Sequence, residues 1–222
     1  MKNGLTELVF ILDRSGSMGG LEADTIGGYN AMLTKQQGVA GEARVTTVLF
    51  DNNYELLHDR IDIKAISPIT EKEYFVVGST ALLDAIGRTI NKIGNVQKHT
   101  ADSFRAEKVL FVIITDGEEN SSHEYTSAQV KALIERQKAK YGWEFIFLGA
   151  NIDAVETAGQ LGIAADRAQS FNSDGKGTQL NYAVIASATM AFRKTGAVPK
   201  AWNQEIDEDF QRRGGQSQGT TA

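Results

Sequence analysis

A short, wholly apolar segment ends directly in an acidic residue, and this junction constrains the fold more than any other part of the chain. Residues 8–12 are all apolar, and Asp13 follows without a spacer. An uninterrupted apolar run of this length is typical of a strand buried on both faces, as in a parallel sheet. A carboxylate at the end of such a strand costs free energy unless a positive group meets it there. The junction therefore indicates a parallel sheet with a functional group at its carboxyl edge.

The same pattern returns in the second half of the chain, where the apolar residues 109–114 lead into Thr115-Asp116-Gly117. If both runs are parallel strands of one sheet, Asp13 and Asp116 leave it at the same edge and face one site. Strand-like and helix-like segments alternate along the chain. We therefore predict an α/β fold with a doubly wound, mostly parallel sheet and helices on both faces.

The remaining elements follow from hydrophobic spacing and turn residues. Two strand-like runs, 43–50 and 54–58, flank a polar turn, which predicts a hairpin and one antiparallel edge strand. Further strands are predicted at 108–115, 143–148 and 168–171, and helices around 26–33, from 82 to 93, between Thr126 and Gly142, near 153–161 and at 178–195. Residues 61–78 show no regular pattern. We expect a single domain over residues 1–202 and a flexible polar tail over 203–222.

Composition excludes several classes of function. The chain has 222 residues and a formal net charge of −5, and no block of Lys and Arg suggests nucleic-acid binding. No apolar run approaches the roughly 20 residues that cross a bilayer, so no membrane partner is expected. Cysteine is absent, which excludes disulfides and thiolate metal sites. The start of the sequence lacks the long apolar region of a signal peptide, which predicts a cytoplasmic protein.

Oxygen-bearing side chains gather in three separate segments at strand ends or loops. They are Asp13, Ser15 and Ser17 in the pattern Asp-x-Ser-x-Ser, Thr80 after Gly-Ser, and Asp116 in Thr-Asp-Gly. In this order they resemble the metal-ion-dependent adhesion site of von Willebrand factor A domains, and looser similarity extends to small bacterial and phage members of that family. The resemblance covers approximately residues 5–195. It implies that Asp13, Ser15, Ser17, Thr80 and Asp116 coordinate a metal directly or through water.

The resemblance also implies a function. In this family an Asp or Glu of a protein partner fills an open position on the metal, and a switch can bring either Asp116 or Thr80 to the ion. The chemistry of the residues agrees, because Mg²⁺ takes oxygen ligands, retains water and meets one or two carboxylates. Mn²⁺ and Ca²⁺ are the alternatives. Neutral hydroxyl ligands leave the cation incompletely compensated, so we expect a protein-binding adaptor domain with no catalytic residue rather than an enzyme.

The main alternative is a metal-dependent phosphotransferase or phosphatase that uses Asp13 as a nucleophile. Such an enzyme would need a second acid near Asp13 and a lysine clamp, and Ser15 argues against that pattern. A phosphate-binding loop is disfavoured because no Gly-Lys-Ser/Thr follows the first strand, and the glycine spacing does not fit a dinucleotide site.

Several polar residues near these segments also have ordinary structural explanations. Thr80 could serve as a helix N-cap, and Asp84 as an acid in the first turn of the same helix. A pair of acids, Glu118 and Glu119, suits a solvated rim. We expect Asn151 and Asp153 to cap loops at the same edge of the sheet.

Overall fold

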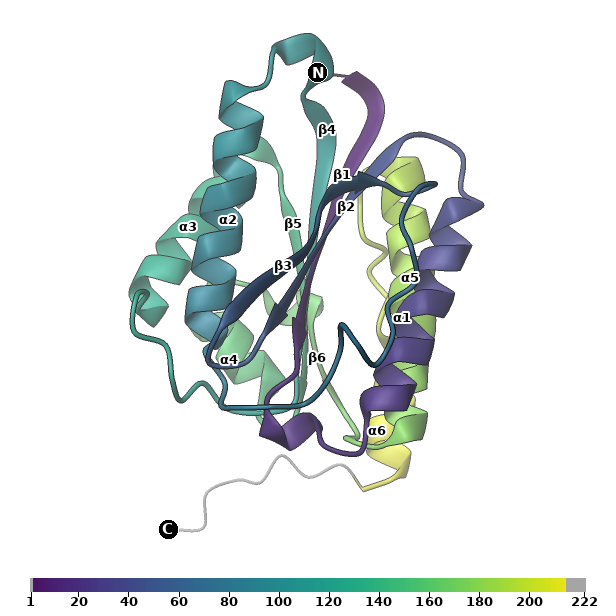
Figure 1. Cartoon of the computed structure of the whole chain (residues 1–222), viewed down its shortest axis with the longest axis vertical. Coiled ribbons are helices and arrows are strands. Elements are labelled where there is room, and N and C mark those ends of the chain that lie inside the picture. Colours follow the sequence, from purple (N-terminus) through teal and green to yellow (C-terminus); the bar gives the residue numbers. More distant parts are fainter. Residues whose placement is uncertain (1, 215–222) are drawn as a thin grey trace.

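A computed structural model describes residues 2–214 and contains a six-stranded sheet in the order β3-β2-β1-β4-β5-β6 (Figure 1). The strands are β1 (Lys2–Asp13), β2 (Ala43–Phe50), β3 (Tyr54–Asp62), β4 (Ala106–Thr115), β5 (Glu144–Ala150) and β6 (Ala168–Phe171). β3 pairs antiparallel with β2, and the other neighbouring strands pair in parallel. The predicted mostly parallel sheet with one antiparallel edge strand is therefore confirmed.

Helices cover both faces of the sheet. They are α1 (Glu22–Gln37), α2 (Leu82–His99), α3 (Ser127–Tyr141), α4 (Ala154–Gln160), α5 (Gly175–Thr195) and α6 (Gln204–Arg212), with short 3-10 helices at Gly16–Met18, Asp102–Phe104 and Ala165–Arg167. In Figure 1, α1, α5 and α6 lie on one face, and α2, α3 and α4 lie on the other. None of the helices in the described range is long and apolar enough to cross a membrane.

The central strand β1 explains why an uninterrupted apolar run was needed. Phe10 packs into the core beneath α1 and α5, while the next residue, Ile11, packs into the core beneath α2 and α3. Successive side chains of a strand point to opposite faces, so a strand covered on both sides must be apolar at every position. The run therefore places Asp13 at the carboxyl end of a fully covered strand.

Local signals set several helix ends as expected. Thr126 and Gln129 form the predicted capping box of α3, and Gly142 ends that helix with a left-handed φ of 64°. α5 begins at residue 175, earlier than the predicted 178, because the Asp174 side chain accepts a hydrogen bond from Gly177 N at 2.8 Å. Cap geometry outweighs the low helix propensity of the two glycines there.

The C-terminal segment corrects the prediction of a flexible tail from residue 203. Residues 204–212 form α6, which packs against β6 and α5, and Ile206 is buried in the core. The segment is mostly polar, but Trp202, Ile206 and Phe210 recur at helical spacing, a signal that the sequence analysis missed. Residues 215–222, the rest of that predicted tail, lie outside the described residues.

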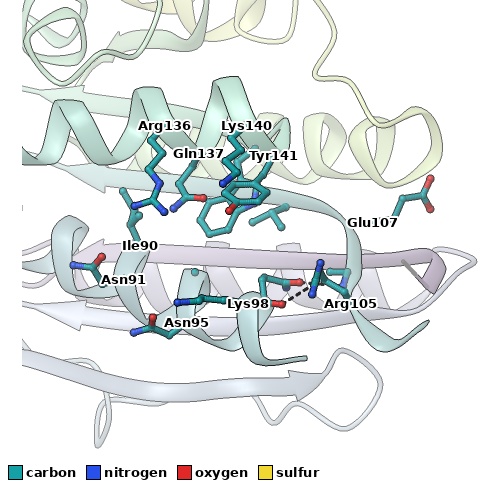
Figure 2. Close-up of a pocket in the computed structure, with 15 residues that line it drawn as sticks. Ile90, Asn91, Asn95, Lys98, Arg105, Glu107, Arg136, Gln137, Lys140 and Tyr141 are labelled. Atoms are coloured by element: carbon teal, nitrogen blue, oxygen red, sulfur yellow. Dashed lines mark hydrogen bonds between the residues drawn. The ribbon is translucent and has the colours of Figure 1, made fainter. Parts of the chain in front are cut away.

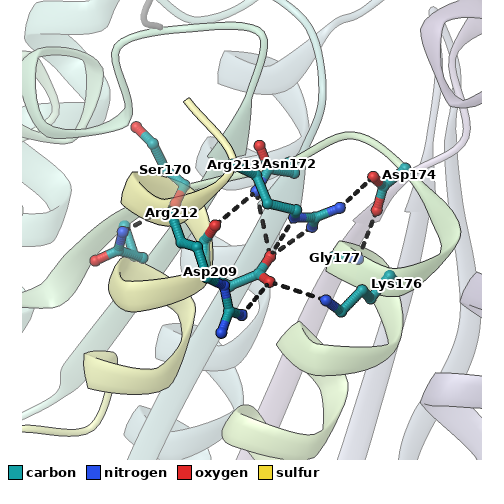
Figure 3. Close-up of polar contacts among 9 residues, drawn as sticks. Ser170, Asn172, Asp174, Lys176, Gly177, Asp209, Arg212 and Arg213 are labelled. Atoms are coloured by element: carbon teal, nitrogen blue, oxygen red, sulfur yellow. Dashed lines mark hydrogen bonds and ion pairs between the residues drawn. The ribbon is translucent and has the colours of Figure 1, made fainter. Parts of the chain in front are cut away.

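A buried carboxylate fastens α6 to the loop after β6 (Figure 3). Asp209 Oδ2 accepts hydrogen bonds from Arg213 Nε at 2.8 Å and Asn172 Nδ2 at 3.2 Å, and Oδ1 accepts one from Arg212 Nη2 at 3.0 Å. Burial by itself would raise the pKa of Asp209, but these donors outweigh it and hold the pKa at about 2. The ionised carboxylate therefore stabilises the docked helix.

We expect Asp209→Asn to lower the free energy of unfolding by about 2 kcal/mol at pH 7, because charged hydrogen bonds are lost in a buried position. The folded pKa lies below the ordinary value of 3.8. The contribution is therefore complete above the unfolded pKa and disappears as the pH falls toward about 2. Urea unfolding followed by circular dichroism at pH 7 and pH 3 measures this. Glu205→Gln, on the exposed side of α6, is the control, and an equal loss in both variants would contradict the role of Asp209.

Candidate metal centre

The five predicted ligands come together at the carboxyl edge of the sheet. Asp13 ends β1, and Asp116 follows β4, which pairs with β1 in parallel. The side chains of both acids are almost fully buried, with 1% of each residue exposed. The register of the two central strands therefore brings the two acids to the same site, as the apolar runs predicted.

Hydrogen bonds connect the three hydroxyl groups to Asp116. Thr80 Oγ1 donates to Ser15 Oγ at 3.0 Å, and Ser17 Oγ donates to Asp116 Oδ1 at 2.5 Å. The oxygens of Ser15 and Ser17 lie 3.1 Å apart. Because the proton of Ser17 is used on Asp116, Ser15 must donate to Ser17. The hydroxyl protons thus all point along one chain that ends on the carboxylate.

Asp13 is held by its own set of donors. Its Oδ1 accepts a hydrogen bond from Ser15 N at 2.7 Å, and its Oδ2 accepts one from Thr115 Oγ1 at 2.6 Å. The hydroxyl of Tyr74 donates to the main-chain oxygen of Asp13 at 2.6 Å. These contacts fix the orientation of the carboxylate without neutralising its charge.

The electrostatics of this cluster favour a positive ligand. Burial raises the pKa of Asp13. Burial is also the main reason that the pKa of Asp116 is raised to about 6, and the nearby charge of Asp13 adds to it. Within residues 2–214, neither acid forms an ion pair with a basic side chain. Two buried carboxylates therefore share a site with hydroxyl groups and no protein cation.

Arg14, the basic residue next to Asp13, is directed elsewhere. Its Nε lies 2.9 Å from Asp51 Oδ2 and its Nη1 lies 2.6 Å from Glu55 Oε2, both in the β2–β3 hairpin. Its guanidinium carbon lies 4.9 Å from the centre of the Phe75 ring. Arg14 therefore ties the loop after β1 to the hairpin and does not neutralise the charges of Asp13 and Asp116.

Glycines allow the loops to approach the cluster closely. A Cβ on Gly117 would lie 3.0 Å from Ser17 Oγ and 3.4 Å from Thr80 Oγ1. Gly16 N donates to the main-chain oxygen of Gly78 at 3.0 Å, which joins the loop after β1 to the segment before α2. The space in front of the hydroxyl groups thus depends on the absence of a side chain at position 117.

Thr80 does not have the ordinary structural role that its position suggested. The N-cap of α2 is Ala81, with no side-chain capping bond, while the Thr80 hydroxyl points to Ser15. The loop after β4 holds the backbone of Thr80 in place, because Thr80 N donates to Asn120 Oδ1 at 2.9 Å. Asn120 is thus a supporting residue that the sequence analysis did not identify.

Two acids near the centre have structural roles that differ from the predicted ones. Glu119 is not a solvated rim residue, because its Oε2 accepts from Leu83 N at 2.8 Å at the start of α2. Glu118, by contrast, is exposed. Asp84 is more than a first-turn acid. Burial opposes its charge, but backbone N–H groups of residues 123–125 together lower its pKa.

The loop between β6 and α5 also reaches the centre. Ser173 Oγ donates to Asp116 Oδ2 at 3.4 Å, a contact that the sequence analysis missed. The signal was present, since the polar residues 172–174 directly follow β6, as Asp116 follows β4. Asn151 Nδ2 donates to the main-chain oxygen of Asp116 at 3.3 Å, and Asp153 caps α4 through Glu156 N. The capping role predicted for Asp153 is therefore confirmed.

Any metal at this centre would rely on hydroxyl oxygens as well as carboxylates. Across residues 2–214, no group of three or more His, Cys, Asp and Glu side chains is arranged to hold an ion. The centre supplies two carboxylates and three hydroxyl groups, which suits a hard cation better than zinc-type nitrogen or sulfur coordination.

Comparison with known proteins identifies the fold. The sequence matches no protein-family model and no curated protein. Among solved structures, the PilB minor pilin from Streptococcus sanguinis matches with a TM-score of 0.60 and 11% identity, over 87% of this chain and 63% of that chain. A von Willebrand factor type A structure from Catenulispora acidiphila matches with a TM-score of 0.54 and 16% identity, over 83% of this chain and 42% of that chain.

A third structure contains a metal. Proximal thread matrix protein 1 from the mussel byssus, whose metal-ion-dependent adhesion site holds zinc, matches with a TM-score of 0.55 and 12% identity, over 83% of this chain and 46% of that chain. At these identities the similarity concerns the fold alone. The chain has a von Willebrand factor A-like α/β fold, and it spans less than two thirds of each of these longer proteins.

Proposed function

We propose that this chain is a metal-dependent protein-binding domain. A divalent cation would be held by Asp13, Ser15, Ser17, Thr80 and Asp116, and an Asp or Glu of a protein partner would complete its coordination. The observation that carries this proposal is the hydrogen-bonded cluster of two buried carboxylates and three hydroxyl groups, in which neither acid pairs with a basic side chain of residues 2–214. A bound cation would supply the positive charge that the two acids lack.

The donor set fits Mg²⁺, with Mn²⁺ and Ca²⁺ as alternatives. These hard ions take carboxylate, hydroxyl and water oxygens, and Mg²⁺ in particular keeps several waters in protein sites. Thr115 and the main-chain N–H of Ser15 would keep Asp13 oriented. The three hydroxyl ligands are neutral, so the two carboxylates carry the negative charge of the proposed ligand set. A divalent cation would balance that charge, and little repulsion would oppose an incoming carboxylate.

The surface beside the centre favours a protein partner. Phe75 and Val77 are 48% and 46% exposed. They lie in the segment between β3 and α2. This segment is hydrogen-bonded to the loop after β1, since Val77 N donates to the main-chain oxygen of Arg14 at 2.9 Å. Exposed apolar side chains next to a polar centre are typical of protein interaction surfaces. A partner could thus bury apolar area around the carboxylate that it presents.

The proposal is tested by affinity capture from a cell extract with the tagged full chain, in Mg²⁺ and in EDTA, read by mass spectrometry. We expect partners that bind in Mg²⁺, are released by EDTA and are lost with Asp116→Ala. Asp153→Ala, which removes an acid at the same edge of the sheet, is the matched control and should keep them. Capture that is equal in Mg²⁺ and EDTA would contradict the proposal.

The same preparations separate binding from the enzymatic alternative. Turnover of generic phosphate esters that needs the metal and is abolished by Asp13→Asn would favour the phosphatase. Both carboxylate oxygens of Asp13 accept hydrogen bonds from the protein, and in the described part of the chain no lysine forms an ion pair with it. This arrangement favours a ligand of a metal over a nucleophile.

A further inference from the structure

A second site lies at the opposite edge of the sheet from the candidate metal centre. There α2, α3 and the start of β4 surround a cavity of about 510 Å³ (Figure 2). Its walls include Asn95 and Lys98 near the end of α2, and Arg136 and Lys140 near the end of α3. Small-molecule sites in proteins commonly have volumes of about 300–1,000 Å³, so the cavity can hold a metabolite.

Positive charge is concentrated in this cavity. Lys98, Arg136 and Lys140 line it, and within residues 2–214 none of them forms an ion pair with a carboxylate. Arg105 adds a fourth cation, although it pairs with Asp102 at 2.9 Å. The whole chain has a net charge of −5, so this cluster contrasts with the rest of the molecule. Free cations facing a cavity favour an anionic ligand.

The acidic residue of the lining does not neutralise these cations. Glu107 Oε2 accepts a hydrogen bond from Gly4 N at 2.6 Å. Figure 2 shows its carboxylate at the edge of the cavity, directed away from Arg136 and Lys140. The Tyr141 ring stands beside these two cations, and Lys140, aided by Arg136, lowers the pKa of Tyr141. The potential in this part of the cavity is therefore positive.

A buried amide in the lining needs a hydrogen-bond donor. Gln137 is 6% exposed, and within the described residues its Oε1 has no hydrogen-bond partner. Figure 2 shows the side chain extending from α3 into the cavity. Gly94 of α2 leaves room for it, since a Cβ there would lie 3.4 Å from Gln137 Nε2. A buried acceptor without a partner is unfavourable, so a ligand with an N–H group would satisfy it.

Apolar and aromatic residues form another part of the lining. Ile90, Val109 and Trp143 come from α2, β4 and the residue before β5, and Trp143 stacks on Phe111 with ring centres 5.4 Å apart. The half-exposed Tyr141 ring stands at the rim, with Lys140 Nζ 5.3 Å from its centre. Such surfaces suit a planar apolar group rather than a free inorganic ion.

We infer that this cavity binds a nucleoside phosphate. The phosphate contacts Lys98, Arg136 and Lys140. The base lies against the aromatic and apolar wall, and its N–H group donates to Gln137 Oε1. The cations, the unpaired acceptor and the flat apolar wall are each matched by one part of this class of ligand, and inorganic phosphate matches only the first. The site is independent of the proposed metal function.

Isothermal titration calorimetry in EDTA with the full chain tests this inference. The probes are AMP, GMP and CMP, the corresponding nucleosides and inorganic phosphate. At least one nucleoside monophosphate should bind at least about tenfold more tightly than both its nucleoside and inorganic phosphate, because charged and apolar contacts act together. The inference is overturned by the absence of binding for all three nucleotides at millimolar concentration. Equal affinity for inorganic phosphate would also overturn it.

Matched variants locate the site. Arg136→Ala/Lys140→Ala should weaken the nucleotide at least about tenfold, since both removed side chains are exposed and the fold does not depend on them. Gln137→Leu should weaken the nucleotide more than inorganic phosphate. Lys64→Ala/Lys131→Ala removes the same charge outside the cavity and should bind as the wild type does. Wild-type affinity in the first double variant, with its fold verified by circular dichroism, would place binding elsewhere and overturn the inference.

Discussion

Asp13→Asn is expected to weaken the binding of Mg²⁺ and Mn²⁺ at least about a hundredfold, because the loss of a ligand should exceed the 10–100-fold effect of residues that only orient one. The amide has almost the same shape but no negative charge, and metal sites of this kind depend on the carboxylate. Calorimetric titration of the metal-free protein measures the affinity. Asp153→Asn is the control, because it changes an acid at the same edge of the sheet that caps α4.

The metal-free Asp13→Asn variant should keep its fold. The substitution removes a buried charge whose pKa burial has raised, and it weakens one of the two hydrogen bonds from Ser15 and Thr115. These effects oppose each other, so we expect the free energy of unfolding to change by no more than about 1 kcal/mol without metal. Metal added to the wild type should stabilise it, and metal added to the variant should not. Equal metal affinity in both proteins would remove the proposed centre.

Much of the fold could be predicted because it depends on local patterns. Residues 8–12 and 109–114 had to be covered on both faces, and alternation of strands and helices then leaves few sheet topologies. The capping box at Thr126 and Gln129 and the left-handed Gly142 are encoded within a few residues. Such features do not require knowledge of distant contacts.

α6 was missed because its apolar residues, Trp202, Ile206 and Phe210, are few and lie among polar ones, although their spacing is helical. Its carboxylate Asp209 contacts Asn172, which is 37 positions away in the sequence. A short apolar stripe, with Ile206 buried and Phe210 partly buried, is supplemented by this polar network. Polar composition alone therefore does not distinguish a docked helix from a flexible tail.

The sequence predicted that the five proposed ligands would lie together, but it did not reveal the residues that support them. Four of the five proposed ligands lie at or just after the ends of β1 and β4, which the sheet brings together, while Thr80 lies just before α2. Asn120 and Glu119 lie in a loop whose course depends on contacts with Thr80 and Leu83. Without the loop conformation, side chains such as these are indistinguishable from solvated polar residues.

A buried ion pair beside the second cavity, far from the candidate metal centre, should contribute strongly to stability. Glu7 of β1 is fully buried, and its Oε2 lies 2.9 Å from Arg60 Nε of β3 and 3.2 Å from Gln97 Nε2 of α2. Burial raises the pKa of Glu7, and the charge of Arg60 opposes this effect without cancelling it. The carboxylate therefore depends on Arg60 to remain ionised inside the protein.

Arg60→Ala is expected to lower the free energy of unfolding by about 3–5 kcal/mol at pH 7.5, because it leaves an uncompensated buried charge. Alanine retains a Cβ at the positive φ of 54°, so relief of backbone strain does not mask the loss. Urea denaturation at constant ionic strength measures the change. Arg88→Ala is the control, since Arg88 pairs with Glu124 on the surface and should contribute less than about 1 kcal/mol.

The pH dependence of the Arg60→Ala effect identifies its cause. The folded pKa of Glu7 lies above 4.5, so the folded protein holds this proton more tightly than the unfolded chain does. Stability from this group therefore falls as the pH rises from 4.5 through the folded pKa. Removing Arg60 raises that pKa further and extends the window toward neutrality, so the loss should be smaller at pH 5 than at pH 7.5. The double variant Glu7→Gln/Arg60→Ala should recover most of the loss and show little pH dependence, because it has no buried charge. A loss that is independent of pH, or absence of recovery in the double variant, would show that packing rather than charge determines the role of Arg60.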